Sequence, residues 1–202
     1  MLTTLFGLQP NKVASAITSS LIKLSINATT QLETITTTTI ETTKPKLEEV
    51  RVNMAEMRAE SKPVELVTSV GSCVAICLYD SVNMCGGLAH IMLPKSAIAP
   101  QEPLPGKFAD TAVPALAKAV RKLGRKEARL SAKIAGGANM FPNMNGLNIG
   151  LKNIEGVKAA LAEHKIRLIA EDVGDAHGRR VTFDVTTGIA TVKRFNGDET
   201  KL

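Results

Sequence analysis

Two short apolar runs joined by a polar segment restrict the fold of this chain more than any other feature of its sequence. Residues 73–79 (CVAICLY) and 88–93 (LAHIML) are strongly apolar, and the connection between them opens with the turn-forming segment 80–83 (DSVN). Runs of this length with a polar connection are typical of a β-hairpin. The sequence therefore predicts a hairpin here.

Helices and further strands are predicted around the hairpin. Asp110 has the position of an N-cap for a helix that stops at Gly124, and Asn153 has the same position for a helix that ends near His164. The remaining strands are predicted at 50–57, 129–135, 166–170, 180–185 and 189–194. Because strands outnumber helices and mostly follow one another, the predicted fold class is α+β with antiparallel pairing, not a doubly wound parallel sheet.

The composition changes near residue 27, where a threonine-rich stretch begins. Most positions from 29 to 43 are Thr, and the stretch ends in Lys44 and Pro45. Such a polar run cannot form a core, so we predict that residues 1–45 are a poorly ordered tail and linker and that the functional domain spans 46–202. A β-strand in the threonine-rich stretch is the alternative, since Thr favours extended structure.

Composition and charge argue against several classes of protein. The 202 residues are 44% hydrophobic but only 3% aromatic, with no Trp, so the core is expected to be aliphatic and base stacking is not expected. A net charge of +6 favours acidic partners, yet no zinc-finger or basic-region pattern points to nucleic acid. No apolar run is long enough for a membrane-spanning helix, so membrane insertion is not expected.

The three cysteines favour a reducing compartment. Cys73, Cys77 and Cys85 are odd in number and close in sequence, which makes a poor disulfide framework. Cys77 is expected to be a core residue, because it lies in an apolar strand. A zinc site is not expected, because Cys85 lies at the far end of the hairpin with no His at ligand spacing.

Cys73 stands where a nucleophile could work. Gly71 and Ser72 precede it at the start of a strand, which would leave the thiol at the end of an element with free amides nearby. The thiol of a catalytic cysteine needs a neighbouring base, usually an imidazole. A turn centred near 81–82 places His90 opposite Cys73 or Ala75 on one face of the hairpin. The residues alone leave two interpretations open: a catalytic pair or a core cysteine.

Residues 136–139 (GGAN) could cradle an anion, but the Lys-Ser or Lys-Thr of a nucleotide-binding loop does not follow them. A structural turn that shapes a substrate groove is the simpler interpretation.

A series of motifs, in order, resembles the CheD family of chemoreceptor glutamine deamidases. The motifs lie at residues 71–80, 86–94, 107–112, 133–141, 170–174 and 178–179, and the similarity runs from about 48 to 194. The resemblance implies a mixed β-sandwich with helices packed on the outside, similar to deamidating bacterial toxins. It also implies a cytoplasmic hydrolase that converts selected receptor glutamines to glutamates and releases ammonia.

The family's catalytic set is a Cys, a His and an upstream Thr. Cys73 and His90 fall on the first two positions and Thr68 on the third, while the longer of two family spacings would fall on Val67. Cys73 would attack the carboxamide carbon of the glutamine, and His90 would protonate the departing ammonia and then activate water. Thr68 would orient the imidazole ring. No metal or organic cofactor is required for this chemistry.

The resemblance also implies partners. The substrate would be the cytoplasmic helical bundle of a chemoreceptor, and a CheC-type phosphatase is a possible second partner. Backbone amides around Gly71 and Ser72 are the expected donors to the oxyanion. Two alternatives stay open: a non-catalytic adaptor that binds receptors or the phosphatase, and a different thiol acyl-transfer enzyme such as a protease or transglutaminase.

Overall fold

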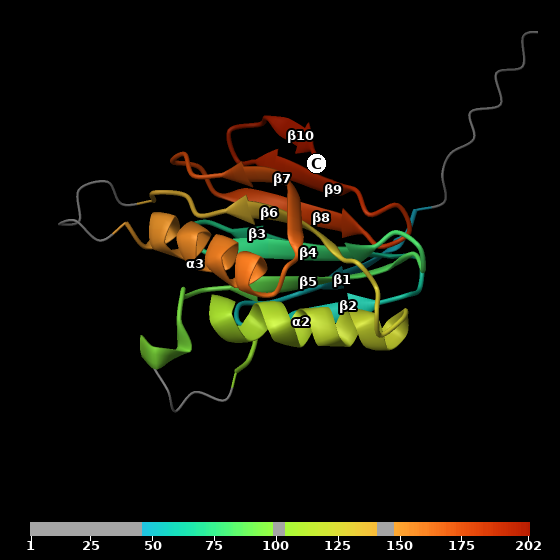
Figure 1. The fold of residues 1–202 in the computed structure, drawn as a ribbon. Coiled ribbons are helices and arrows are strands. Elements are labelled where there is room, and N and C mark those ends of the chain that lie inside the picture. Colours follow the sequence, from blue (N-terminus) through green and yellow to red (C-terminus); the bar gives the residue numbers. More distant parts are fainter. Residues whose placement is uncertain (1–45, 99–103, 141–147) are drawn as a thin grey trace, which may run out of the picture. The chain divides into compact units, whose positions relative to one another are not determined.

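Three segments of the chain, 46–98, 104–140 and 148–202, are described in the computed structural model. The tail and linker predicted at 1–45 lie outside the described residues. Within the described segments the chain forms ten strands, two α-helices and one short 3-10 helix (Figure 1). None of the described helices is long and apolar enough to cross a membrane. The α+β class is confirmed.

Two sheets are stacked in the described part of the chain. Sheet A has the order β1 (Glu48–Arg51), β3 (Val64–Val70), β8 (Arg179–Asp184), β9 (Ala190–Arg194), β10 (Glu199–Lys201). Sheet B has the order β2 (Met57–Glu60), β5 (Cys85–Ile91), β4 (Val74–Asp80), β6 (Ser131–Gly136), β7 (Arg167–Val173). The pairs β1–β3 and β6–β7 are parallel and the other pairs are antiparallel, so the predicted mixed sandwich is confirmed.

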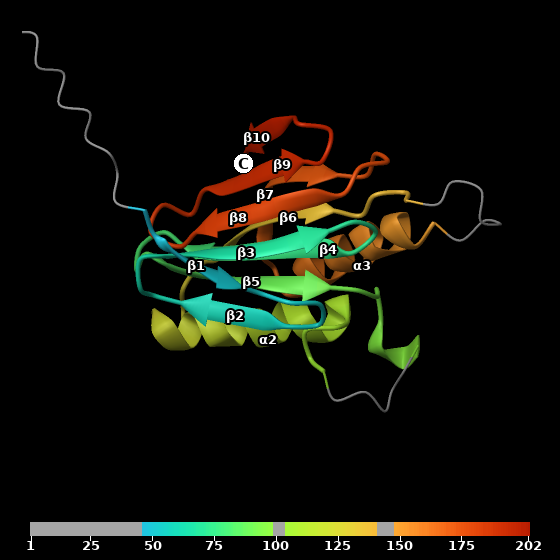
Figure 2. The same ribbon diagram turned by 180° about the vertical axis from the view of Figure 1, so that it is seen from behind.

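The helices α2 (Ala109–Leu123) and α3 (Ile149–Glu163) pack on the outer face of sheet B, and Figure 2 shows sheet A from the opposite side. Strand β4 is buried on both faces: Ile76 and Leu78 pack towards the helices, whereas Ala75 and Cys77 pack towards sheet A. This alternation fixes which β4 and β5 side chains point into the space between the two sheets.

The predicted hairpin is formed by β4 and β5. Its register pairs Ala75 with His90, one of the two partners that the sequence allowed. The single strand predicted at 50–57 is wrong, because β1 ends at Arg51 and β2 starts at Met57 in the other sheet. Between them Ala55 has a φ of 63°, a left-handed turn that moves the chain from sheet A to sheet B.

Both helix starts differ from the sequence prediction. Phe108 is the N-cap of α2, and the Asp110 carboxylate instead accepts hydrogen bonds from the Ser96 backbone and hydroxyl at 2.9 Å. Asn148, not Asn153, caps α3. An N-cap signal is only a polar residue ahead of an apolar stripe, so an Asp or Asn that serves a tertiary contact gives the same signal.

Candidate active site

A hydrogen bond between the two sheets holds the histidine of the predicted site. Thr68 of β3 lies on the inner face of sheet A, and its Oγ1 is 2.8 Å from Nδ1 of His90, which lies on β5 of sheet B. Both side chains are almost fully buried, at 4% and 3% exposure. The structure therefore brings together two of the three residues of the predicted catalytic set, and the bond fixes the plane of the imidazole ring.

The second ring nitrogen of His90 is free to act. Its Nε2 is buried and has no hydrogen-bond partner among the described residues. Burial lowers the pKa of His90 from 6.5 to about 4, because the charged ring loses its hydration. The imidazole is consequently neutral at physiological pH. With a proton on Nδ1 facing Thr68, Nε2 would carry the lone pair that a general base needs.

Cys73 lies one residue ahead of β4, on the inner face of sheet B. Because Ala75 pairs with His90, Cys73 is the diagonal neighbour of His90. The Cα atoms of residues in that relation are about 7 Å apart. The thiol is half-buried, makes no hydrogen bond to His90 Nε2, and has its pKa raised by that burial. The free protein thus holds a neutral thiol near a neutral imidazole.

The backbone around Cys73 is held by its carbonyl oxygens. The Gly71 oxygen accepts from Ala138 N at 2.8 Å, and the Cys73 oxygen accepts from Gly137 N at 2.7 Å. The Ser72 oxygen between them accepts from the Asn153 amide at 2.9 Å. Residues 136–139 are therefore a structural turn, as the sequence indicated, and this turn positions the thiol.

The amide hydrogens of the same segment are unused. No hydrogen bond from the backbone N–H of Gly71, Ser72 or Cys73 occurs within the described part of the chain. All three residues are partly exposed, so a ligand could reach these donors. With the carbonyls fixed and the amides free, the segment offers hydrogen-bond donors to a ligand beside Cys73.

Gly136 and Arg179 hold the backbone at the end of β6, next to Cys73. A Cβ atom on Gly136 would lie 2.3 Å from the Cys73 oxygen, and its φ of +117° suits glycine alone. The fully buried Arg179 donates to the Gly136 oxygen at 3.3 Å and forms an ion pair of 2.8 Å with Asp172. Arg194 makes a second ion pair with Asp172. Paired in this way, the buried charges fix the end of β6.

Asn153, predicted from the sequence to cap a helix, instead contacts the backbone beside the candidate site. Its side chain is completely buried, and its Nδ2 donates to the oxygens of Ser72 and Met92 at 2.9 Å each. The signal was present in the sequence, because Asn153 lies among the buried positions of the α3 stripe beside Ile154 and Val157. A polar residue in an apolar stripe indicates a buried hydrogen bond rather than a cap.

A cavity of about 200 Å³ opens beside the Thr68–His90 pair. Its wall includes the β1–β2 connection at Asn53 and two cationic side chains, Arg51 and Arg180. Cys73 does not line it. The space is sufficient for several water molecules and contains polar groups that can hold them.

The other two cysteines are core residues. Cys77 is 2% exposed and Cys85 is fully buried, and burial raises the pKa of the Cys77 thiol to about 12. The described residues include no group of three or more His, Cys, Asp or Glu side chains that could hold a metal ion.

Comparison with known proteins shows which proteins this chain is similar to. The model of the family described as CheD chemotactic sensory transduction matches residues 92–194. A protein of Thermotoga maritima named chemoreceptor glutamine deamidase CheD is 43% identical over 149 residues, covering 73% of this chain and 93% of its own length. A probable chemoreceptor glutamine deamidase of Methanococcus vannielii is 44% identical over 148 residues, covering 73% and 96%. Another from Desulforamulus reducens is 41% identical over 149 residues, covering 72% and 90%.

Proposed function

Because this chain belongs to the CheD family, we propose that it is a hydrolase that converts selected glutamine side chains of chemoreceptors to glutamate with release of ammonia. Cys73 is the nucleophile, His90 the acid and base, and Thr68 the group that orients the ring. The observation that carries the proposal is the buried Thr68–His90 hydrogen bond with the opposite ring nitrogen unpaired. The substrate is the receptor's cytoplasmic helical bundle, so the proposal places the enzyme in the cytoplasm.

The first step begins from the neutral pair. His90 Nε2 takes the thiol proton of Cys73 as the sulfur attacks the carboxamide carbon, so a C–S bond forms and the carbonyl oxygen becomes an oxyanion. Burial disfavours both the free thiolate and the free imidazolium. Proton transfer therefore becomes favourable only when the negative charge can pass to the bound amide.

The free backbone amides would donate hydrogen bonds to the oxyanion. The N–H groups of Gly71, Ser72 and Cys73 belong to the segment that carries the sulfur and have no other partner in the described segments. One such donor contributes about 3 kcal/mol to transition-state stabilisation. His90 then returns its proton to the leaving nitrogen, the C–N bond breaks, and ammonia departs from a thioester.

Hydrolysis of the thioester repeats the chemistry with water. The cavity lined by Thr68 and His90 could hold the water, which would have to reach both Nε2 and the thioester at Cys73. The water adds to the thioester carbon, the C–S bond breaks, and the sulfur recovers its proton from His90. The product is the glutamate carboxylate, and neither a metal ion nor an organic cofactor takes part in the proposed steps.

A non-catalytic adaptor that binds receptors or a CheC-type phosphatase is the second candidate. The observation that favours it is the raised pKa of the Cys73 thiol, which lacks a hydrogen bond to His90 in the described structure. An adaptor would need the shape of this surface but not the reactivity of the sulfur. The two candidates differ in whether glutamine is converted.

The test uses a chemoreceptor cytoplasmic fragment as substrate. Peptide mass spectrometry is expected to find gains of one mass unit at specific glutamines, with one ammonia released per site. The Cys73→Ala variant is expected to abolish conversion while still binding the fragment. Cys77→Ala is the matched control, since this thiol is sealed in the core, and it is expected to keep activity.

Other outcomes would contradict the proposal. Binding of the fragment without conversion by the unaltered protein would favour the adaptor. Cleavage or crosslinking of the fragment would indicate a different acyl-transfer enzyme. If Cys77→Ala were inactive and Cys73→Ala active, Cys73 would not be the nucleophile.

A further inference from the structure

A second, larger cavity lies at the other end of β4 from Cys73. Its volume is about 1090 Å³, and Tyr79 is among its lining residues. Tyr79 lies six residues beyond Cys73, which corresponds to about 20 Å along a strand. We call this cavity the basic groove, because its lining contains a single carboxylate, Glu127, and six cationic side chains. The six are Arg121, Lys126, Arg129, Lys133, Lys165 and Arg167.

Most of these cations are available to a ligand. Lys133 donates to the carbonyl oxygens of Gly188 and Leu202, and Arg121 donates to that of Ala128, so these two have partners. The other four are exposed, and the described residues form no ion pair with any of them. Four exposed positive charges with one nearby carboxylate make this surface strongly basic.

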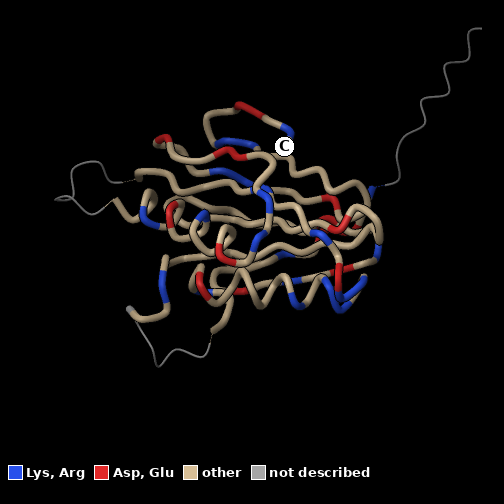
Figure 3. The backbone as a smooth tube through the Cα atoms, in the orientation of Figure 1, with Lys and Arg blue, Asp and Glu red and all other residues tan. Residues whose placement is uncertain are grey.

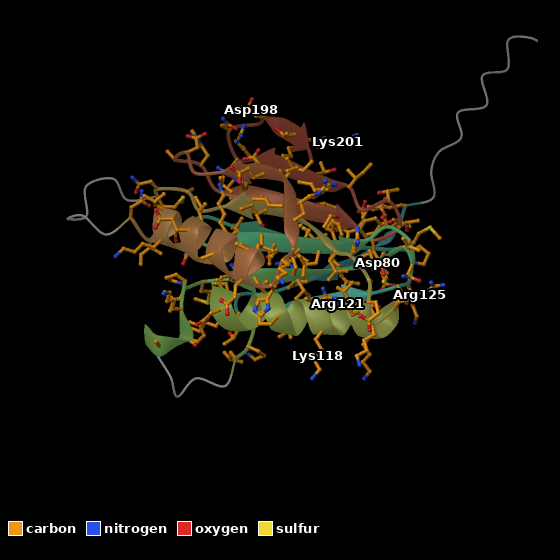
Figure 4. The ribbon with its side chains drawn as sticks, in the orientation of Figure 1. Asp80, Lys118, Arg121, Arg125, Asp198 and Lys201 are labelled. Atoms are coloured by element: carbon orange, nitrogen blue, oxygen red, sulfur yellow. The ribbon has the colours of Figure 1, made fainter. Side chains whose placement is uncertain are left out.

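The charge is not explained by the helix ends alone. Arg121 lies in the last turn of α2, where a cation complements the helix dipole, and Figure 3 shows Lys and Arg gathered at this end of the helix. Figure 4 shows Arg121 and Arg125 at the same end, whereas Lys118 projects away from the sheets. Arg129 and Arg167, however, belong to no helix: the former precedes β6 and the latter opens β7.

The form of the groove suits an extended acidic surface rather than a compact phosphate. A phosphate site usually has backbone amides or a helix N-terminus that converge on one point. Here the nearby helix ends are the C-termini of α2 and α3, marked by Arg121 and by the C-cap His164. The free cations are spread over separate segments, so they match carboxylates that are themselves spaced along a chain.

We infer that the basic groove is a second docking site for the protein substrate, occupied by an acidic stretch of the same receptor helix that presents its glutamine to Cys73. The inference rests on the proposed function. A helix rises 1.5 Å per residue, so a separation of about 20 Å corresponds to about 13 residues. Because β4 is buried on both faces, the receptor helix has to pass over the surface, so the acidic stretch lies at least about 13 residues from the deamidated glutamine.

The test compares two triple charge reversals of the full chain. The groove variant is Lys126→Glu, Arg129→Glu and Arg167→Glu, and the control is Lys46→Glu, Lys118→Glu and Lys201→Glu, which changes net charge equally outside the groove. With a receptor cytoplasmic fragment, the groove variant is expected to raise KM about tenfold, since three exposed ion pairs are replaced by repulsion. Its kcat, and its activity on a short glutamine peptide, are expected to stay unchanged.

The substrate supplies the complementary change. Replacing acidic residues at least about 13 positions from the glutamine by Gln, one cluster at a time, is expected to raise KM for the unaltered enzyme at one cluster, but not for the groove variant. Raised salt is expected to weaken binding of the unaltered enzyme and to leave the groove variant nearly unaffected.

The possible failures are distinguishable. An unchanged KM in the groove variant, or an equal rise in the control, overturns the docking site while deamidation stands. If the unaltered protein converts no glutamine, the proposed function is overturned. The groove can still be tested in that case, by measuring how tightly Cys73→Ala binds the fragment with and without the groove reversals. If the reversals weaken binding of a DNA duplex and leave the receptor fragment unaffected, the groove is a nucleic-acid site and the inference is wrong.

Discussion

Asn153 is the residue whose replacement tests the architecture of the site most directly. Its buried amide donates to the Ser72 oxygen, next to the thiol, and to the Met92 oxygen, just beyond β5. One side chain on α3 thus connects the backbone at Cys73 with the end of the strand that carries His90. If the separation of these two residues is set by this amide, its loss should reduce activity more than stability alone explains.

The expected loss of stability can be worked from these bonds. Asn153→Ala removes two hydrogen bonds and leaves two carbonyl oxygens without a donor, at about 1 to 2 kcal/mol each. Ser72 is partly exposed, so its oxygen can turn to water, and we expect a total loss of about 2 to 3 kcal/mol. Asn153→Asp keeps the shape but sets a carboxylate against two carbonyl oxygens, so its cost should be larger.

The assay pairs urea unfolding with deamidation kinetics and with the rate of Cys73 alkylation. Asn148→Ala is the matched control on the same helix: it removes the N-cap bond, costs about 1 kcal/mol, and should leave kcat unchanged. Asn153→Ala should lower kcat at least tenfold under conditions where the protein is fully folded, and should alter the alkylation rate. A folded Asn153→Ala with normal kcat would refute the reasoning, as would a loss of stability no larger than that of the control.

Two further predictions follow from the same geometry. Gly136→Ala should destabilise the protein well beyond Gly197→Ala and abolish activity, because its Cβ would lie 2.3 Å from the Cys73 oxygen. Gly197 is the control: it has a similar φ of +108°, a Cβ there would meet nothing within 4 Å, and the substitution should cost only about 1 to 2 kcal/mol through the backbone. Equal melting temperatures for the two variants would show that the contact at Gly136 is not tight. Between pH 6.5 and about 4 the unfolded chain binds a proton at residue 90 that the folded chain excludes, so stability should fall as the pH is lowered, by about 2 kcal/mol between pH 7 and pH 4.5. Urea unfolding at both pH values should show that His90→Gln lacks this part of the loss, and an identical loss in the variant would contradict the shifted pKa.

The sequence was informative where local patterns decide the structure. The hairpin follows from two apolar runs and a polar turn, and once its turn is placed, the position of His90 relative to Cys73 is limited to two registers. Thr68 was available only through the family resemblance, because its bond to His90 joins two different sheets. Nothing local to β3 indicates that contact.

The missed features depend on contacts between distant segments. The parallel pairs β1–β3 and β6–β7 cannot be read from strand patterns alone, because parallel and antiparallel strands share the same alternation of side chains. Asn153 was predicted to be a cap because Asn ahead of an apolar stripe usually is one. Only the fold shows that the carbonyl oxygens of Ser72 and Met92 lie beside it.

Burial shifts the pKa values of Cys73 and His90, the two groups proposed to react, in opposite directions, and this constrains how the proposed mechanism can work. The raised pKa of Cys73 and the lowered pKa of His90 both favour uncharged forms, so the free protein gains nothing from separating charge between them. A resting thiol is a poor nucleophile and is slow to oxidise. In the proposed mechanism, the cost of charge separation would fall once a bound carboxamide accepts the electrons of the sulfur and the free amides at Gly71 and Ser72 stabilise the oxyanion. Under the proposed mechanism, the same burial that makes the thiol inert at rest makes its reactivity depend on the substrate.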